Sequence, residues 1–184
     1  MENKEKILAA AASLFARQGL SFTMQDLANE LHMAKKTVYK LFPSKEVLLQ
    51  EVLEETFRRI QQEKARLAGS DLPYKEKLRR VMIALPEDIR VLDLRRLQPL
   101  AQRYPEVYHS LQHHLRSNWE PVYALLEEGK REGYIRDFDP VILRITVSAS
   151  IESFLSGGEL EEAGITYEEA LERMMDIIME GIAV

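Results

Sequence analysis

The chain has 184 residues, of which 46% are apolar and 30% are charged, as is usual for a folded globular protein. It has no cysteine, which excludes disulfides, thiolate metal sites and thiol nucleophiles, and no cofactor is indicated. No segment is apolar enough to span a bilayer, and the N-terminus has no signal-peptide pattern. We therefore expect a cytoplasmic protein without a membrane partner.

The net charge of −5 by itself argues against nucleic-acid binding, but the charges are unevenly distributed. Residues 1–47 contain seven basic and five acidic side chains, whereas the rest of the chain has an excess of seven negative charges. Between Ala34 and Lys45 there are four lysines and no acid. Because salt screens each charge beyond about 8 Å, this local basic segment matters more for DNA than the sum over the chain.

Apolar residues at helical spacing predict helices along nearly the whole chain, and no segment alternates as a strand does. The first helix is expected to end at Gly19. A second, short helix begins after Thr23, whose spacing to Asp26 resembles a capping box. A third short helix covers about Lys35–Leu41 and cannot continue past Pro43.

Ser44 is a suitable N-cap for a fourth helix, which should end before the break at residues 69–73. A long helix with a kink at Pro121 is predicted over residues 106–131. The other expected helices cover residues 74–85, 87–97, 140–155 and 167–182. The last of these should begin with a capping box formed by Thr166 and Glu169. The chain is thus predicted to be all-α, with about nine helices.

The connection between the second and third helices is short enough to require a tight turn, so the pair is predicted to be a helix-turn-helix. The apolar residues expected to fill the wedge against the first helix are Leu27, Leu31, Val38 and Leu41, with Ala28 at the close crossing and Met33 at the turn. The side chains left exposed on the third helix are Lys35, Lys36, Thr37, Tyr39 and Lys40. Lysines and hydroxyls suit phosphate oxygens and base edges. Lys45, at a helix N-terminus, is predicted to contact the DNA backbone, although it could be a plain surface residue.

Residues 23–28 and 33–48 together resemble the DNA-binding domain of the tetracycline-repressor (TetR/AcrR) family. The shared features are the threonine before the second helix, the tyrosine in the third, the phenylalanine after it and the Ser-Lys-Glu start of the fourth. The resemblance implies a three-helix DNA-binding domain over residues 1–47 and a helical ligand-binding and dimerisation domain over residues 48–184. The residues predicted to contact DNA are Thr23, Lys35, Lys36, Thr37, Tyr39, Lys40 and Lys45.

The chain departs from the family pattern at two positions. His32 stands where the turn usually has glycine, and a positive φ there would cost about 1 kcal/mol. Ala34 stands where the third helix often has a serine or threonine N-cap. Neither change alters the expected fold.

Large apolar and amphipathic side chains in the middle of the chain predict an elongated pocket for a hydrophobic small molecule. The same side chains could instead form an ordinary core. The candidate ligand-binding residues are Met82, Tyr104, Tyr108, Trp119, Tyr123 and Phe154, with Arg95, Arg96, Gln98 or His114 as polar anchors. His109 and His113 have metal-ligand spacing but no clear further ligand, so no metal site is predicted.

The last two helices have more apolar residues than one small domain needs to cover. The candidate dimer-interface residues are Ile142, Ile145, Ala149, Met174, Ile178 and Met179. The leading hypothesis is therefore a homodimeric, ligand-responsive repressor that binds a pseudo-palindromic operator on double-stranded DNA and is released by a hydrophobic small molecule. A helical dimerisation or interaction protein without ligand control is the alternative. An enzyme is not expected, because no catalytic motif is present.

Overall fold

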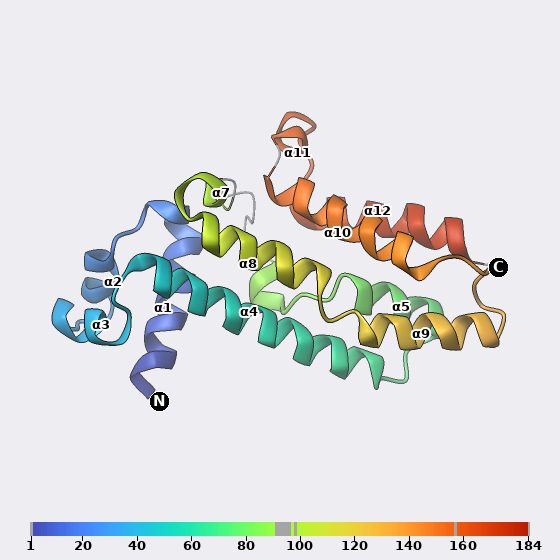
Figure 1. Ribbon diagram of the computed structural model, residues 1–184, viewed down its shortest axis with the longest axis horizontal. Helices are drawn as coiled ribbons and strands as arrows, with labels where there is room; N and C mark the ends of the chain where they lie inside the picture. The colour runs from blue at the N-terminus through green and yellow to red at the C-terminus, as the bar shows by residue number, and fades with distance from the viewer. Residues whose placement is uncertain (1, 91–96, 98, 157, 184) are drawn as a thin grey trace. The chain divides into compact units, whose positions relative to one another are not determined.

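The computed structural model describes residues 2–90, 97, 99–156 and 158–183. Within these residues it has nine helices of seven or more residues, three single-turn helices and no strand (Figure 1). This confirms the predicted all-helical fold. No helix in the described part of the chain is both long and apolar enough to cross a membrane.

The N-terminal helices are α1 (Glu2–Gln18), the 3₁₀ turn η1 (Gly19–Ser21), α2 (Met24–Glu30) and α3 (Lys35–Leu41). They pack around side chains that are almost completely buried, namely Ile7, Leu14, Phe22, Leu27, Val38, Phe42 and Leu48. Most of these positions lie on the apolar helix faces that the sequence pattern predicts. The prediction that Leu41 fills the wedge against the first helix is wrong, because its side chain is 42% exposed. The adjacent Phe42 is buried instead, since the chain leaves the helix there with φ −130°.

The remaining helices begin with α4 (Lys45–Ala68), followed by α5 (Tyr74–Met82), α6 (Glu87–Arg90), α7 (Leu100–Arg103), α8 (Pro105–Arg116), α9 (Glu120–Arg131), α10 (Pro140–Ser156), α11 (Glu159–Glu162) and α12 (Tyr167–Ile182). The predicted capping box at the start of α12 is confirmed, because the Thr166 hydroxyl accepts a hydrogen bond from the Glu169 backbone N–H at 3.2 Å. The helix expected over residues 87–97 is seen as α6, and residues 91–96 lie outside the described part.

The prediction of a single kinked helix over residues 106–131 is wrong. The chain forms two helices, α8 and α9, with Asn118 between them in the left-handed region at φ 59°. Pro121 lies in the first turn of α9, where its missing N–H leaves no helical hydrogen bond unmade. The proline therefore starts a helix and does not kink one.

The chain divides into two compact units. The first combines Met1–Phe57 with Arg96–Leu111, and the second combines Arg58–Arg95 with Gln112–Val184. In the first unit, Gln50 of α4 donates a hydrogen bond to the Ser110 hydroxyl of α8 at 2.9 Å. This packing division differs from the functional boundary expected between residues 47 and 48, which stays a prediction.

In the second unit, α5 packs closely against α9. Tyr74 stacks on Tyr134 with ring centroids 4.8 Å apart, and its hydroxyl donates to the Leu125 carbonyl at 2.8 Å. Gly129 gives this ring its space, because a Cβ at position 129 would lie 1.8 Å from the Tyr74 hydroxyl oxygen. A glycine inside a helix is thus used here for close packing.

Candidate functional site

The turn between α2 and α3 has the geometry of a helix-turn-helix. His32 has a φ of 50°, so the left-handed conformation considered for this position is present. The backbone N–H of Met33 closes the turn by donating to the Ala28 carbonyl at 2.9 Å. Ala28 and Leu27 are fully buried, so the turn packs against the core of these helices.

Thr23 caps the N-terminus of α2. Its hydroxyl accepts from the Asp26 backbone N–H at 3.1 Å, and the Asp26 carboxylate accepts from the Thr23 backbone N–H at 2.7 Å. The predicted capping box is therefore confirmed. These hydrogen bonds to Thr23 hold the pKa of Asp26 below its usual value, and the field of Lys45 adds to the effect. The hydrogen bonds between Thr23 and Asp26 thus fix the start of α2.

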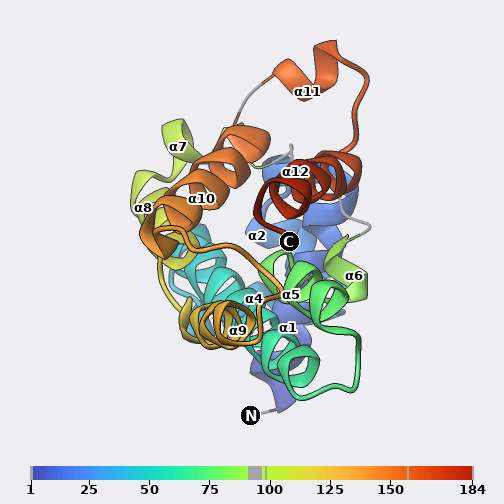
Figure 2. The same cartoon turned by 90° about the vertical axis from the view of Figure 1, so that its right-hand side faces the viewer.

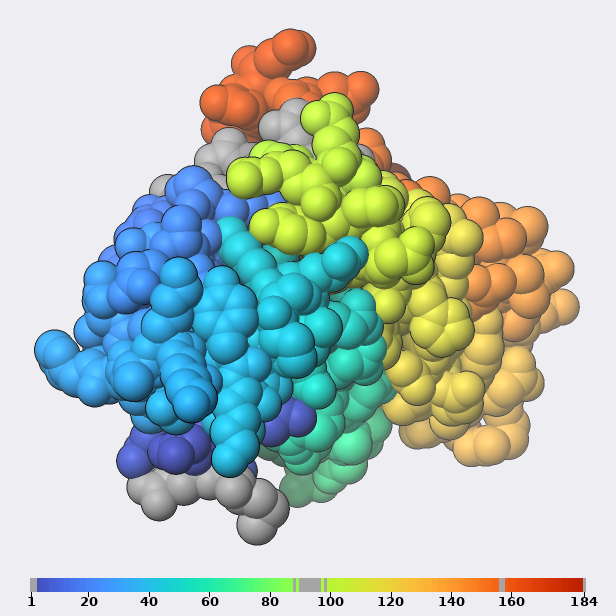
Figure 3. Space-filling view, turned by 60° about the vertical axis from the view of Figure 1, so that its left-hand side comes forward, coloured from blue at the N-terminus to red at the C-terminus, as the bar shows by residue number. Residues whose placement is uncertain are grey.

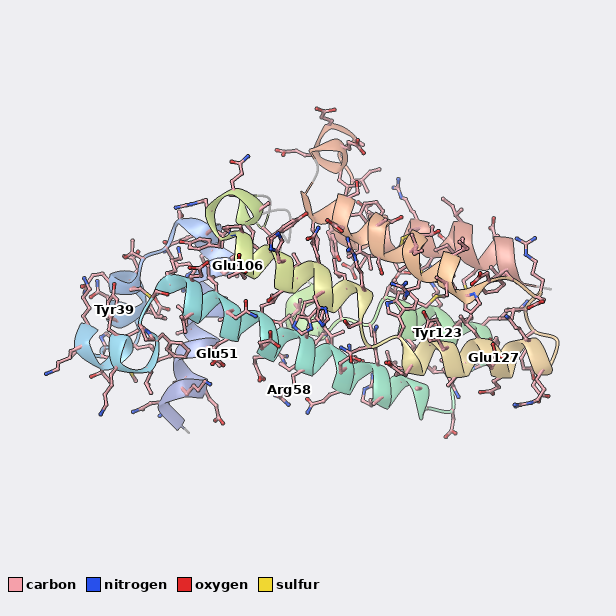
Figure 4. All side chains as sticks on the ribbon, in the orientation of Figure 1. Tyr39, Glu51, Arg58, Glu106, Tyr123 and Glu127 are labelled. Atoms are coloured by element: carbon pink, nitrogen blue, oxygen red, sulfur yellow. The ribbon has the colours of Figure 1, made fainter. Side chains whose placement is uncertain are left out.

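The outer face of α3 exposes the predicted basic and hydroxyl side chains together. Lys35, Lys36, Thr37 and Lys40 are exposed, and Tyr39 is 39% exposed. The ammonium of Lys35 lies 5.6 Å from the centroid of the Tyr39 ring. Figure 3 shows the residues of α3 at the surface, and Tyr39 is labelled in Figure 4. The inner face is anchored by Val38, which is fully buried, so α3 presents a fixed row of donors.

Lys45 points its ammonium at backbone oxygens of the 3₁₀ turn. Its Nζ donates to the Leu20 carbonyl at 2.6 Å and also to the Phe22 carbonyl, and it lies 4.1 Å from the centroid of the Phe22 ring. Burial lowers the pKa of Lys45 to about 8, and the positive charge of Arg103 lowers it further. The ammonium thus joins the start of α4 to η1 and the residue that follows it. The phosphate contact expected from Lys45 stays a prediction.

The helices α10 and α12 pack side by side (Figures 1 and 2) and leave an apolar face uncovered. Ile142 is 61% exposed, and Ile145 and Ala149 of the same predicted interface are also exposed. Ile178 and Met179 are half-buried, while Met174 is buried. Sequence reasoning missed Ile177, which is 75% exposed. Spacing alone gave no signal for Ile177, because adjacent positions can share one buried stripe, as Met174 and Met175 do on the same helix.

The candidate ligand-binding residues fall in both units. Tyr104 and Tyr108 are half-buried in the first unit. In the second unit Met82 and Trp119 are buried, and the rings of Trp119 and Tyr123 have centroids 6.3 Å apart. Phe154 lines a separate hollow of about 380 Å³ between α10, α11 and α12. The anchors Arg95, Arg96 and Gln98 lie outside the described residues, and His114 is half-buried.

Lys64 of α4 is a charged residue that sequence reasoning missed. Only 8% of it is exposed, and its ammonium lies 5.6 Å from the centroid of the Trp119 ring. Burial lowers the pKa of Lys64 to about 8, and the field of Glu120 opposes that effect. The available signal was its helical spacing to Ile60 and Leu67, which places a lysine in an apolar stripe. As for metals, no group of three potential ligands occurs among the described residues.

The chain is similar to known bacterial proteins in sequence and in structure. Residues 7–52 match the family model for bacterial regulatory proteins of the tetR family. The HTH-type transcriptional regulator YvaF of Bacillus subtilis, itself uncharacterised, is 29% identical over 179 residues, which cover 97% of this chain and 94% of that relative. A protein assigned to the TetR family of regulators from Vibrio parahaemolyticus has a solved structure with 28% identity, a TM-score of 0.59 and 98% coverage of both chains.

A further solved structure shares the fold. It is a protein from Saccharomonospora viridis assigned as a transcriptional regulator, in complex with choline. It is 21% identical, has a TM-score of 0.77, and the match covers 100% of this chain and 98% of that one.

Proposed function

The chain belongs to the TetR family of transcriptional regulators, and from this premise we propose that it is an effector-responsive repressor that binds DNA as a homodimer. The observation that carries the proposal is the exposed outer face of α3, where Lys36, Tyr39 and Lys40 surround a buried anchor, Val38. Members of this family are regulators and not enzymes. A repressor acts where the chromosome lies, so we place the protein in the cytoplasm.

In this proposal α3 enters the major groove of the operator. Lys35, Lys36 and Lys40 contact phosphates or guanine edges, while Tyr39 and Thr37 contact phosphates or a thymine methyl group. Thr23 and Lys45 contact the backbone beside the groove. Lys45 has three N–H donors, of which two go to carbonyls, so one is left for a phosphate oxygen.

The apolar face of α10 and α12 supports the homodimer. The exposed side chains of Ile142, Ile145 and Ile177 form a surface that a second copy would cover, with Ile178 and Met179 at its margin. Two-fold symmetry would then place two α3 helices on successive half-sites, so the operator is a pseudo-palindrome.

Effector control is supported by the aromatic side chains of the second unit and by the choline complex of the Saccharomonospora relative. We propose that a hydrophobic small molecule binds the state of the dimer that does not fit the operator. A coupling of about 1–3 kcal/mol between the two sites is enough for such a switch.

The test is operator binding measured by fluorescence anisotropy with DNA from upstream of the protein's own gene. Tyr39→Ala should weaken binding by about 1–3 kcal/mol and leave a dimer in sedimentation, because Tyr39 lies on the outer face of α3. Ile142→Arg should give a monomer that binds the operator weakly, because it buries a charge in the dimer face.

Two results would contradict the proposal. Unchanged operator affinity in Tyr39→Ala would remove α3 as the recognition helix. A wild-type monomer at micromolar concentration that still binds the full operator tightly would remove the homodimer.

A further inference from the structure

Lys64 occupies a position that a helix in this place normally gives to an apolar residue. On α4 it lies four residues after Ile60 and three before Leu67, and all three side chains are buried. Transfer of an ammonium from water to such a place is unfavourable unless it gains a partner. An ammonium at this buried position therefore needs a binding partner.

No described residue supplies that partner through an ion pair or a hydrogen bond, although the nitrogen atom itself is not fully closed off from solvent. Among the residues that the structure describes, the Lys64 ammonium forms neither an ion pair nor a hydrogen bond, and its close neighbour is the Trp119 ring at 5.6 Å. The carboxylate of Glu120 acts on it only through its field, and Glu120 itself is exposed. With a pKa of about 8, the group is still mostly charged at pH 7.

The surroundings of the ammonium suit an anion attached to an apolar body. Trp119 is buried and its indole N–H already donates to the Leu115 carbonyl at 3.2 Å, so the ring offers apolar contact. The Tyr123 ring lies beside it. Trp119 is also the N-cap of the twelve-residue α9, which has no side-chain cap there, so its free backbone N–H groups add positive potential.

We propose that Lys64 binds the acid group of the effector, and that the effector is a hydrophobic carboxylic acid whose apolar part lies against Trp119 and Tyr123. The inference rests on the proposed effector control and names the chemical class of the ligand. A carboxylate would supply the missing partner of the buried ammonium. A cation such as choline would be repelled, because Lys64 already places a positive charge over the Trp119 ring.

Trp119 is the single tryptophan of the chain, so its fluorescence reports on this site alone. Wild-type protein is titrated with decanoate and benzoate, with the matched alcohols decanol and benzyl alcohol, and with choline. At least one acid should bind about tenfold or more tightly than its alcohol, as expected for a hydrogen bond between charged groups. Iodide should also quench Trp119 more strongly than caesium.

Three variants make the result specific. Lys64→Met should lose the preference for the acid and the excess quenching by iodide. Lys64→Arg keeps the charge and should retain both. Lys75→Met removes an exposed lysine of the same unit and should behave as the wild type. Urea unfolding of each variant shows that it is folded.

The inference is wrong if neither acid is preferred over its alcohol, or if the preference survives in Lys64→Met. Operator anisotropy, run in parallel, separates this outcome from failure of the proposed function. An operator that is bound but released by no acid, in a protein whose Trp119 shows no preference for acids, overturns the ligand class and leaves DNA binding intact. Absence of operator binding in the wild type overturns the proposed function instead.

Discussion

Two lysines of α4, one half-buried and one buried, show how different the surroundings of two ammonium groups can be. Lys45 and Lys64 lie in different units, and burial lowers the pKa of each to about 8. The ammonium of Lys45 donates to the carbonyls of Leu20 and Phe22, whereas that of Lys64 meets, among the described residues, the ring of Trp119 and the field of Glu120. Burial therefore disfavours the charge of both groups in the folded chain, and the two carbonyl acceptors of Lys45 offset part of that cost.

The largest expected effect is a difference in sign between the two lysine-to-methionine substitutions. Lys45→Met should lower the free energy of unfolding by about 2 kcal/mol, because two hydrogen bonds from a charged donor are lost. Lys64→Met should raise it by about 2 kcal/mol, because a buried lysine with no ion pair among the described residues is replaced by an apolar chain of similar length. Urea denaturation at pH 7 measures both.

Lys75→Met is the control, since Lys75 is exposed, and it should change the free energy of unfolding by less than about 0.5 kcal/mol. If Lys64→Met destabilised the protein as much as Lys45→Met does, the two sites would be equivalent and the comparison would break down.

A second effect is the dependence of stability on pH. Because the pKa of Lys64 is lower in the folded chain than in the unfolded chain, the unfolded state binds more protons between pH 8 and about 10.5. The free energy of unfolding should therefore rise with pH in this window. From pH 7 to 9.5 the contribution of Lys64 is about 2 kcal/mol.

Lys64→Met lacks this contribution, so its advantage over the wild type at pH 7 should disappear near pH 9.5. Urea denaturation of both proteins at the two pH values measures the change. An advantage that is the same at both values would mean that Lys64 keeps its proton in the folded state at pH 9.5.

The smallest effect concerns the aromatic rings beside the two ammonium groups. The Lys45 ammonium is 4.1 Å from the Phe22 centroid, and the Lys64 ammonium is 5.6 Å from the Trp119 centroid. Double-mutant cycles with Phe22→Leu and Trp119→Leu should give a coupling of about 1 kcal/mol for the first pair and about half of that for the second. The reverse order would show that distance to the ring does not control the interaction.

Local patterns in the sequence predicted what depends on neighbours in the chain. The helix faces, both capping boxes and the tight turn at His32 follow from spacings of a few residues. The break between α8 and α9 was missed because a proline can either kink a helix or begin one, and only the left-handed Asn118 decides between these outcomes.

The candidate site was predictable where exposure follows from helical spacing, as it does on α3. The partners of Lys45 and Lys64 were not predictable in this way. The carbonyls of Leu20 and Phe22 lie more than twenty residues before Lys45, and Trp119 lies 55 residues after Lys64. Such pairs arise from packing between distant segments, which periodicity within one helix does not specify.

The contact of Gly129 with Tyr74 restricts the order in which this protein can change during evolution. Alanine at position 129 would push the Tyr74 ring away from its stacking partner Tyr134 and from the Leu125 carbonyl, so it is harmful while the tyrosine remains. Once Tyr74 has been replaced by a smaller residue, glycine keeps only its cost in a helix, about 1 kcal/mol relative to alanine. The Gly129→Ala substitution then becomes favourable. The replacement of Tyr74 therefore has to come before the replacement of Gly129.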